Sequence, residues 1–310
     1  MLIAALVAAV VVGSAASRSM GSAGSIAVAG GGISVRSTAG QLTRLTTNAR
    51  DQFPAWSRDG KRIAFVRRGP DVSRCELFVM NADGSDLHQV GSVETDCSRV
   101  SWGPGDRRIA FGGGAQGRVN NGLWVVNADG TGLKRLLALK HSLGGRETTA
   151  ATAPAWSPNG RTIVFSWSGR SPGSRPSPRL AGALATIRPD GSGLRVLVKP
   201  RAKQLDLYVL PSLSRDGKRL AFVHTNLSAG GRTELVVSSA DGTRRHTLLR
   251  LPFNPTGQGT PSWSPNGRVL AFWRVCGQQA CVSTISARGG KPRVLLRGDY
   301  QQPTWGPASG

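Results

Sequence analysis

The chain contains 310 residues, of which 39% are hydrophobic, and this share excludes a wholly disordered protein. Only 6% of the residues are aromatic while glycine occurs 41 times, a mixture typical of many short strands joined by turns and not of a helical protein. The 40 lysines and arginines outnumber the 17 aspartates and glutamates, and the net charge of +23 attracts polyanions such as nucleic acid, anionic lipid or acidic cell-wall polymer. Because the basic residues form no long run, the charge is equally typical of a solvated surface that binds nothing.

The N-terminus carries an apolar run from Leu2 to Val12, which is too short to span a bilayer as a helix. Its length fits the apolar core of a signal peptide, and Ser14, Ala15 and Ala16 form a cleavage site of small residues. No lysine or arginine precedes the run, which indicates either a weak export signal or a start codon further upstream. We expect export to the periplasm, the cell envelope or the medium. The expected divisions are a signal peptide (1–16), a linker (17–24) and one domain (25–307).

Two phrases recur along the rest of the chain. The first is a large apolar residue, usually tryptophan, followed by Ser or Gly and a turn. Its copies are "AWSRDG" (55–60), "SWGPGD" (101–106), "AWSPNG" (155–160), "SLSRDG" (212–217), "SWSPNG" (262–267) and "TWGPAS" (304–309). The second is a tight turn later in each unit: "NADGSDL" (81–87), "NADGTGL" (127–133), "RPDGSGL" (188–194), "SADGTRR" (239–245) and "SARGGKP" (286–292). A repeat of 42 to 57 residues indicates a propeller or a solenoid.

Each unit reads as four antiparallel strands, which describes one blade of a propeller. The last copy of the first phrase, at Trp305, is not followed by further strands. Residues 25–30, 33–37 and 42–46 supply three strands at the other end of the chain. We therefore predict an all-β fold, a six-bladed β-propeller of four-stranded antiparallel blades, closed by one C-terminal plus three N-terminal strands.

The two phrases resemble the repeat of the TolB-like, WD-repeat-like six-bladed β-propellers, from about Ser25 to Pro307. The resemblance implies the fold and leaves several roles open. Members include a protein of the envelope-spanning Tol system that binds a peptidoglycan-associated lipoprotein, propellers that gate prolyl-oligopeptidase-type peptidases, and lyases. The α/β domain of the first, the hydrolase domain of the second and the metal-binding His/Gln cluster of the third are not evident in this sequence.

The repeated residues themselves are expected to be structural. Leu213 replaces the tryptophan in one copy, so the position requires apolar packing and not stacking on a sugar or base. The Asp-Gly turns lack the bidentate glutamate and the oxygen spacing of a calcium loop. We expect no metal and no cofactor.

Length variation between units points to one face. We name as the long-loop face the connections within units (67–75, 112–121, 166–182 and 224–233) and between units (91–99, 139–153, 199–210 and 251–260). The opposite end, built from the two repeated turns, is the short-turn face. Basic residues predicted on the long-loop face are Arg67, Arg68, Arg74, Arg99, Lys140, Arg146, Arg170, Arg175, Arg179, Lys199, Arg201 and Lys203, and both tyrosines lie there. Variable loops on a rigid ring favour binding.

The predicted binding residues are Arg99, Arg201, Lys203, Tyr208 and Tyr300. Arginine offers bidentate contacts to carboxylate or phosphate, and tyrosine offers a large amphipathic surface. We expect a monomeric, non-catalytic scaffold that binds an envelope protein or an anionic cell-surface polymer, and not nucleic acid. The alternative is a propeller-type lyase or hydrolase that acts on an acidic polysaccharide or peptide at the channel mouth.

Two strings resemble enzyme motifs without the required context. The glycine-rich string at 112–117 is followed by a strand and not by the helix that would bind phosphate, and the Gly-x-Ser-x-Gly string at 169–173 lies in a loop. The four cysteines of an exported chain predict two disulfides, Cys75–Cys97 and Cys276–Cys281.

Overall fold

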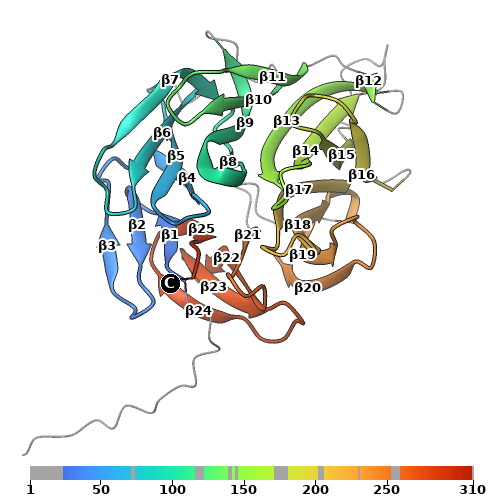
Figure 1. Cartoon of the computed structure of the whole chain (residues 1–310). Helices are drawn as coiled ribbons and strands as arrows, with labels where there is room; N and C mark the ends of the chain where they lie inside the picture. Colours follow the sequence, from blue (N-terminus) through green and yellow to red (C-terminus); the bar gives the residue numbers. More distant parts are fainter. Residues whose placement is uncertain are drawn as a thin grey trace, which may run out of the picture.

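The structure, a computed structural model, describes residues 24–70, 74–115, 122–138, 142–143, 146–170, 181–201, 206–229, 231–252 and 259–308. The predicted signal peptide lies outside these residues. The described chain forms an all-β propeller of four-stranded antiparallel blades around a central channel (Figure 1). No helix in these residues is long and apolar enough to cross a membrane.

The strands follow one another as antiparallel meanders. The sheet that contains both ends of the described chain has the order β25 (Gln301–Trp305), β1 (Ile26–Ala29), β2 (Ile33–Arg36) and β3 (Leu42–Arg44). The next two meanders are β4 (Asp51–Trp56), β5 (Arg62–Arg68), β6 (Cys75–Asn81) and β7 (His88–Thr95), then β8 (Ser101–Trp102), β9 (Arg108–Ala115), β10 (Gly122–Asn127) and β11 (Lys134–Ala138), with a short 3-10 helix, η1 (Pro104–Asp106), between β8 and β9. Pairing of β7 with β9 joins these two meanders into one eight-stranded sheet, whereas the sequence predicts separate blades.

Three further sheets complete the described ring. One contains β12 (Ser142–Leu143), β13 (Arg146–Trp156), β14 (Ile163–Arg170), β15 (Ala181–Ile187) and β16 (Arg195–Val198). Another contains β17 (Asp206–Leu213), β18 (Arg219–Asn226), β19 (Arg232–Ser239) and β20 (His246–Leu251), with η2 (Leu227–Ala229) after β18. The last contains β21 (Gly259–Trp263), β22 (Val269–Cys276), β23 (Gln279–Ser286) and β24 (Arg293–Arg297).

The first repeated phrase forms the same turn in each Ser-x-Asp/Asn-Gly copy. The Ser57 hydroxyl donates to Asp59 at 2.6 Å and accepts the Arg62 amide at 2.9 Å. Gly60 has a φ of 73°, which glycine adopts without steric cost. Ser157, Ser214 and Ser264 make the same pair of contacts in later copies. The phrase therefore reverses the chain between the first and second strands of a unit.

The second phrase closes the turn between the third and fourth strands. The Asp83 carboxylate accepts the amide and the hydroxyl of Ser85, at 2.9 and 2.7 Å. Asp129 and Asp241 accept the corresponding groups of Thr131 and Thr243. These carboxylates act inside their own turns, which agrees with the turn interpretation of the Asp-Gly phrase.

Packing between units uses the repeated apolar positions. The second strands β5, β9, β14, β18 and β22 each carry a phenylalanine that is fully buried, and these residues are Phe65, Phe111, Phe165, Phe222 and Phe272. Trp102 and Trp263 are also buried, and their indole N–H groups donate to Ala55 O and Ser212 O in the preceding units, both at 2.9 Å. The tryptophans therefore pack between blades, as predicted.

An arginine at the start of the second strand covers the tryptophan of the next unit. The Arg62 guanidinium carbon lies 4.7 Å from the Trp102 ring centroid, and Arg219 lies 4.6 Å from that of Trp263. Arg108 covers Trp156 in the same way at 5.1 Å. Such contacts are favourable because the cation faces the negative surface of the ring. Part of the basic excess is therefore structural.

The sheet formed by β25 and β1–β3 joins the two ends of the described chain, as predicted. Trp305 pairs with Ile26 across β25 and β1, and Gly306 N donates to Ser25 O at 2.8 Å. β25 also bonds both neighbouring units, because Trp305 N donates to Ser262 Oγ at 2.9 Å and Gln302 Oε1 accepts Phe53 N at 2.8 Å.

Removal of β25 tests how much the ring depends on this sheet. A chain truncated after Asp299 leaves the edge of β1 unpaired, and we expect a loss of roughly 4 kcal/mol or more, a melting temperature lower by about 10 °C or more, and aggregation. Calorimetry and size-exclusion chromatography measure both effects. A chain truncated after Pro307 is the control and keeps the full-length melting temperature. Equal melting temperatures for the two truncated chains would contradict the closing role of β25.

Both predicted disulfides are present. Cys75 at the start of β6 is bonded to Cys97 in the connection between β7 and β8, with the Cα atoms 5.0 Å apart. Cys276 at the end of β22 is bonded to Cys281 in β23, with the Cα atoms 5.8 Å apart. The first crosslink ties a blade to the connection that enters the next one, and the second closes a hairpin.

The two crosslinks are expected to differ in their contribution to stability. The first closes a loop with a sequence separation of 22 residues and the second one of 5. In the loop-entropy model, Cys75→Ala/Cys97→Ala lowers the free energy of unfolding by about 3 kcal/mol and Cys276→Ala/Cys281→Ala by about 2 kcal/mol. Urea unfolding of both double variants measures the difference. A larger loss for the hairpin variant would show that loop closure is not the source of the stabilisation.

Candidate functional site

The first strand of every unit lines the central channel, which contains a cavity of about 180 Å³. Its walls come from β4, β8, β13, β17, β21 and β25, and the lining residues include Ser101, Ser212, Ser262, Thr304, Arg58 and Arg99. The lining offers hydroxyl groups, guanidinium groups and backbone carbonyls. No carboxylate is among the described residues that line it.

A bulge shapes the first strand at the residue before the repeated proline. The residues with left-handed φ at this position are Phe53, Ala153, Leu210, Thr260 and Gln302, with φ between 33° and 57°. Non-glycine residues rarely adopt this conformation, and register shifts interrupt the strand pairing at the first four. In the unit that starts at β8, Arg99 occupies the equivalent place, and the left-handed residue is Cys97 instead.

Arg99 reaches across the channel to two other units. Its Nη2 donates to Pro261 O at 2.9 Å, and its Nη1 lies 3.4 Å from Pro211 O. Among the described residues no carboxylate pairs with this guanidinium. Burial lowers the pKa of Arg99 to about 10 because it disfavours the charged form. Two carbonyls therefore hold a positive charge that has no counter-ion in the described part of the chain.

Two more arginines lie at the short-turn end of the channel. Arg58 Nη1 donates to Pro158 O at 3.2 Å, and Arg215 Nη2 lies 3.4 Å from Arg58 O, although the two arginines are 157 residues apart. They line a second hollow of about 170 Å³ together with Trp56, Trp263, Trp305, Pro265 and Pro307. Burial is the main cause that lowers the pKa of Arg58, Asp106 opposes it, and Arg215 lowers it further.

Comparison with known proteins identifies the family of this ring. The family model of the TolB beta propeller domain matches residues 39–309. The chain belongs to the TolB beta propeller family. The Tol-Pal system protein TolB of Francisella tularensis subsp. holarctica is 31% identical over 120 residues, which cover 36% of this chain and 27% of that protein. The chain thus matches little more than a quarter of the length of this curated relative.

Solved structures share the fold at low sequence identity. TolB from Acinetobacter baumannii aligns with a TM-score of 0.69 and 19% identity, over 93% of this chain and 68% of that chain. A putative TolB from Agrobacterium tumefaciens gives 0.60 and 15% over 91% and 98%, and a chain of a nidogen/laminin complex gives 0.65 and 10% over 92% and 99%. These alignments support the propeller fold alone.

The structure of this TolB-family propeller separates the other predicted binding residues. Arg201 is exposed and donates from Nε and Nη2 to the buried Asp206 carboxylate, both at 2.9 Å. Lys203 lies outside the described residues. Tyr300 is half-buried, and it packs against the buried cluster of Ile26, Val28, Ala271 and Val282. Neither Arg201 nor Tyr300 contacts Arg99 through a bond in the described part of the chain.

The prediction that Tyr208 lies in an exposed connecting loop is wrong. Tyr208 lies within β17 and is only 5% exposed. Its ring stacks on His224, with the centroids 4.6 Å apart, and meets the edge of Phe222. β17 begins at Asp206, four residues before the predicted end of the loop at residue 210, so the ring fills the core of this blade.

A buried polar chain runs beneath Arg201. His224 Nε2 lies 2.8 Å from Asp206 Oδ1, and its Nδ1 lies 3.3 Å from Glu234 Oε2. Arg250 Nε donates to Glu234 Oε1 at 3.1 Å. Burial alone would raise the pKa of Asp206, but hydrogen bonds from Arg201 and His224 outweigh it and hold the pKa well below its usual range. This network satisfies its own charges and therefore stabilises the blade.

Other arginines predicted on the long-loop face also have side-chain partners. Arg67 Nε donates to Asp51 at 2.6 Å, and Arg74 Nη1 lies 3.5 Å from Glu94. Arg68 donates to Gln52 at 3.3 Å. Lys140, Arg175 and Arg179 lie outside the described residues. Arg99 is therefore the predicted binding residue that stands out, since only backbone carbonyls hold it among the described contacts.

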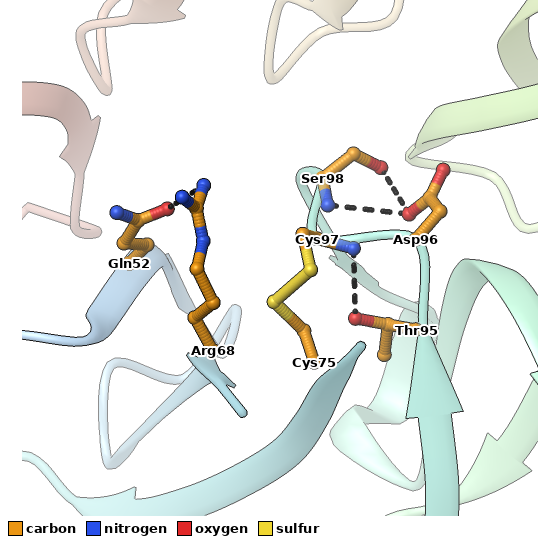
Figure 2. The surroundings of a disulfide bond; sticks show 7 residues. All are labelled: Gln52, Arg68, Cys75, Thr95, Asp96, Cys97 and Ser98. Atoms are coloured by element: carbon orange, nitrogen blue, oxygen red, sulfur yellow. Dashed lines mark hydrogen bonds between the residues drawn. A yellow bond between two sulfur atoms is a disulfide. The ribbon is translucent and has the colours of Figure 1, made fainter. Parts of the chain in front are cut away.

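Asp96 lies beside the disulfide that enters the third unit, as Figure 2 shows. Its Oδ1 accepts the amide and the hydroxyl of Ser98, at 3.2 and 2.6 Å. Its Oδ2 is buried without a partner among the described residues and faces Gly112, where a Cβ atom would lie 2.5 Å away. Burial raises the pKa of Asp96 to about 6. The carboxylate is therefore poised to take up a proton in mildly acidic solution.

The positions of Arg58 and Arg215 within the repeats are a signal that the sequence analysis did not use. Aligning the repeats places Arg58 and Arg215 where other units have Pro104, Pro158, Pro265 and Pro307. The alignment also places Arg99 at the bulge before the repeated proline. Of the enzyme-like strings, 112–115 lie in β9 and 169–170 end β14, and the remainder of both lies outside the described residues. Groups of His, Cys, Asp and Glu that could hold a metal are absent from the described part.

Asp96→Asn tests the buried carboxylate. The folded-state pKa of Asp96 is about 6 against 3.8 for a free aspartate, so the folded state binds the proton more tightly. Its contribution to stability is therefore present at about pH 4 and falls as the pH rises through about 6, by up to roughly 3 kcal/mol. Relative to Asp96→Asn, the wild type should lose stability between pH 4.5 and pH 7 in urea unfolding. Asp299→Asn, an exposed control, should keep the wild-type profile, and an identical profile for Asp96→Asn would contradict the raised pKa.

Proposed function

We propose that this chain is an exported, monomeric and non-catalytic TolB-family propeller that binds an acidic segment of an envelope protein on its long-loop face. The observation that carries the proposal is Arg99, whose charge lies in the channel with no carboxylate among the described residues. A buried charge without a counter-ion is costly, and a bound carboxylate would compensate it. Export rests on the apolar run that ends at Val12 and on the two disulfides.

The family supports a protein partner over a polymer. The curated relative is named as a Tol-Pal system protein, so it works within a protein assembly. We infer further that the ring has six blades, with the eight-stranded sheet counted as the meanders β4–β7 and β8–β11, which three residue pairs between β7 and β9 connect. In this arrangement Arg201 and Tyr300 contribute the outer part of the binding surface, and Arg99 contributes its centre. Lys203 belongs to the same proposal.

Arg99→Gln tests the central contact. Glutamine keeps an amide donor for the carbonyls of Pro211 and Pro261 and removes the charge. We expect the dissociation constant for a fluorescent oligoglutamate peptide to rise about tenfold, and the wild-type affinity to fall steeply with added salt. Fluorescence anisotropy measures both. Arg161→Gln, which removes an exposed charge from a short turn, should change the affinity less than twofold.

Three outcomes would overturn the proposal. Equal losses for Arg99→Gln and Arg161→Gln would show that only net charge matters. Tighter binding of polygalacturonate than of the peptide would favour the anionic polymer as the partner. Turnover of either ligand would favour the alternative of a propeller-type enzyme.

A further inference from the structure

At the short-turn end of the channel, two of the six repeated turns differ from the other four. The second residue of the repeated turn is proline in four units, and those prolines are Pro104, Pro158, Pro265 and Pro307. Pro307 and Pro104 pack on the turn glycines of the following units, since a Cβ on Gly60 would lie 2.5 Å from Pro307 and one on Gly160 would lie 2.9 Å from Pro104. These prolines fix the contacts between adjacent turns.

Arg58 and Arg215 replace this proline and make no such contact. A Cβ on Gly105, in the unit after Arg58, would meet nothing within 4 Å. The Arg58 side chain instead extends to Pro158 O at 3.2 Å, and Arg215 Nη2 lies 3.4 Å from Arg58 O. Two cations are therefore brought together over the channel, where their repulsion is unfavourable unless an anion lies between or beside them.

The carboxylates near this mouth already have partners. Asp59 accepts Ser57 Oγ and Lys61 N, and Asp216 makes the corresponding bonds with Ser214 and Lys218. Asp106 accepts the backbone amides of Arg58 and Asp59, at 2.7 and 3.0 Å. It offsets part of the charge on Arg58, but neither guanidinium forms an ion pair within the described chain. The mouth thus offers cationic donors without a carboxylate between them.

The walls of the mouth indicate the size and character of the ligand. The hollow has a volume of about 170 Å³, which accommodates a side chain or a chain end and not a folded domain. Trp56, Trp263 and Trp305 line it together with Leu213, and the indole N–H groups of Trp56 and Trp305 have no acceptor in the described part of the chain. Apolar walls beside two guanidinium groups suit the carbon skeleton and the carboxylate of a peptide. A bare phosphate would use only the guanidinium groups.

We propose that Arg58 and Arg215 form a second binding site, on the short-turn face, for a peptide carboxylate. The guanidinium groups bind the carboxylate oxygens through charge-assisted hydrogen bonds, and the tryptophan and proline rings contact the adjoining carbon atoms. The site lies at the short-turn end of the channel, and Arg58 also lines the channel cavity that contains Arg99.

The test uses the full chain and three labelled hexapeptides of Gly and Ser: one with a free C-terminal carboxylate, one amidated, and one amidated with an internal glutamate. We expect the two carboxylate-bearing peptides to bind at low salt and the amidated neutral peptide not to bind. Tighter binding of the first peptide would identify a C-terminal carboxylate as the ligand. Tighter binding of the third would identify an acidic side chain. Arg58→Gln/Arg215→Gln should weaken binding by about tenfold or more, because both charge-assisted contacts are lost.

Arg161→Gln/Arg268→Gln is the matched control, because it removes the same charge from exposed arginines of equivalent turns. It should change the affinity less than twofold. If the first double variant melts at a lower temperature, Arg215→Gln alone, which alters an exposed side chain, should still weaken binding about threefold or more. Equal losses in both double variants, binding of the neutral peptide, or competition by inorganic phosphate at lower concentration than acetate would overturn the proposal.

Discussion

The antiparallel pairing of β25 with β1 holds the ends of the described chain together, and the channel depends on it. Each unit buries its flat faces against its neighbours, so an open ring would expose apolar surface at two edges. Closure also sets the position of every first strand around the axis (Figure 1). Arg99 can reach Pro261, and Arg215 can reach Arg58, only because the units between them occupy fixed places.

Several arginines of the described chain fall into three physical classes. Arg62, Arg108 and Arg219 cover the tryptophan of the following unit. Where Leu213 replaces that tryptophan, Thr162 replaces the arginine before it. A second class, including Arg67 and Arg201, pairs with buried aspartates. The third class, Arg58, Arg99 and Arg215, lies at the channel and has no carboxylate ion-pair partner among the described residues.

The repeats predict the fold because local signals agree with one another. Turn chemistry at Ser57 and Gly60, alternation in the strands and the pairing of β25 with β1 all agree with closed four-stranded blades. The candidate binding site was less predictable, because knowing that a residue lies in a connecting loop does not reveal whether its side chain pairs with another residue. Tyr208 entered the core since β17 begins at Asp206, and the Asp206 carboxylate bound Arg201. Arg58 went unnoticed because it stands inside a phrase that is otherwise structural.

The offset between the sequence repeat and the blade has a consequence for how such rings change in evolution. The sequence unit begins with its first strand, yet one blade takes β25 from the chain's end and β1–β3 from its beginning. Duplication or loss of a whole internal unit would leave that composite sheet intact. The number of blades can therefore change by recombination within the gene while the closing sheet is inherited unaltered, and a new pair of arginines can come to face each other whenever the ring changes size.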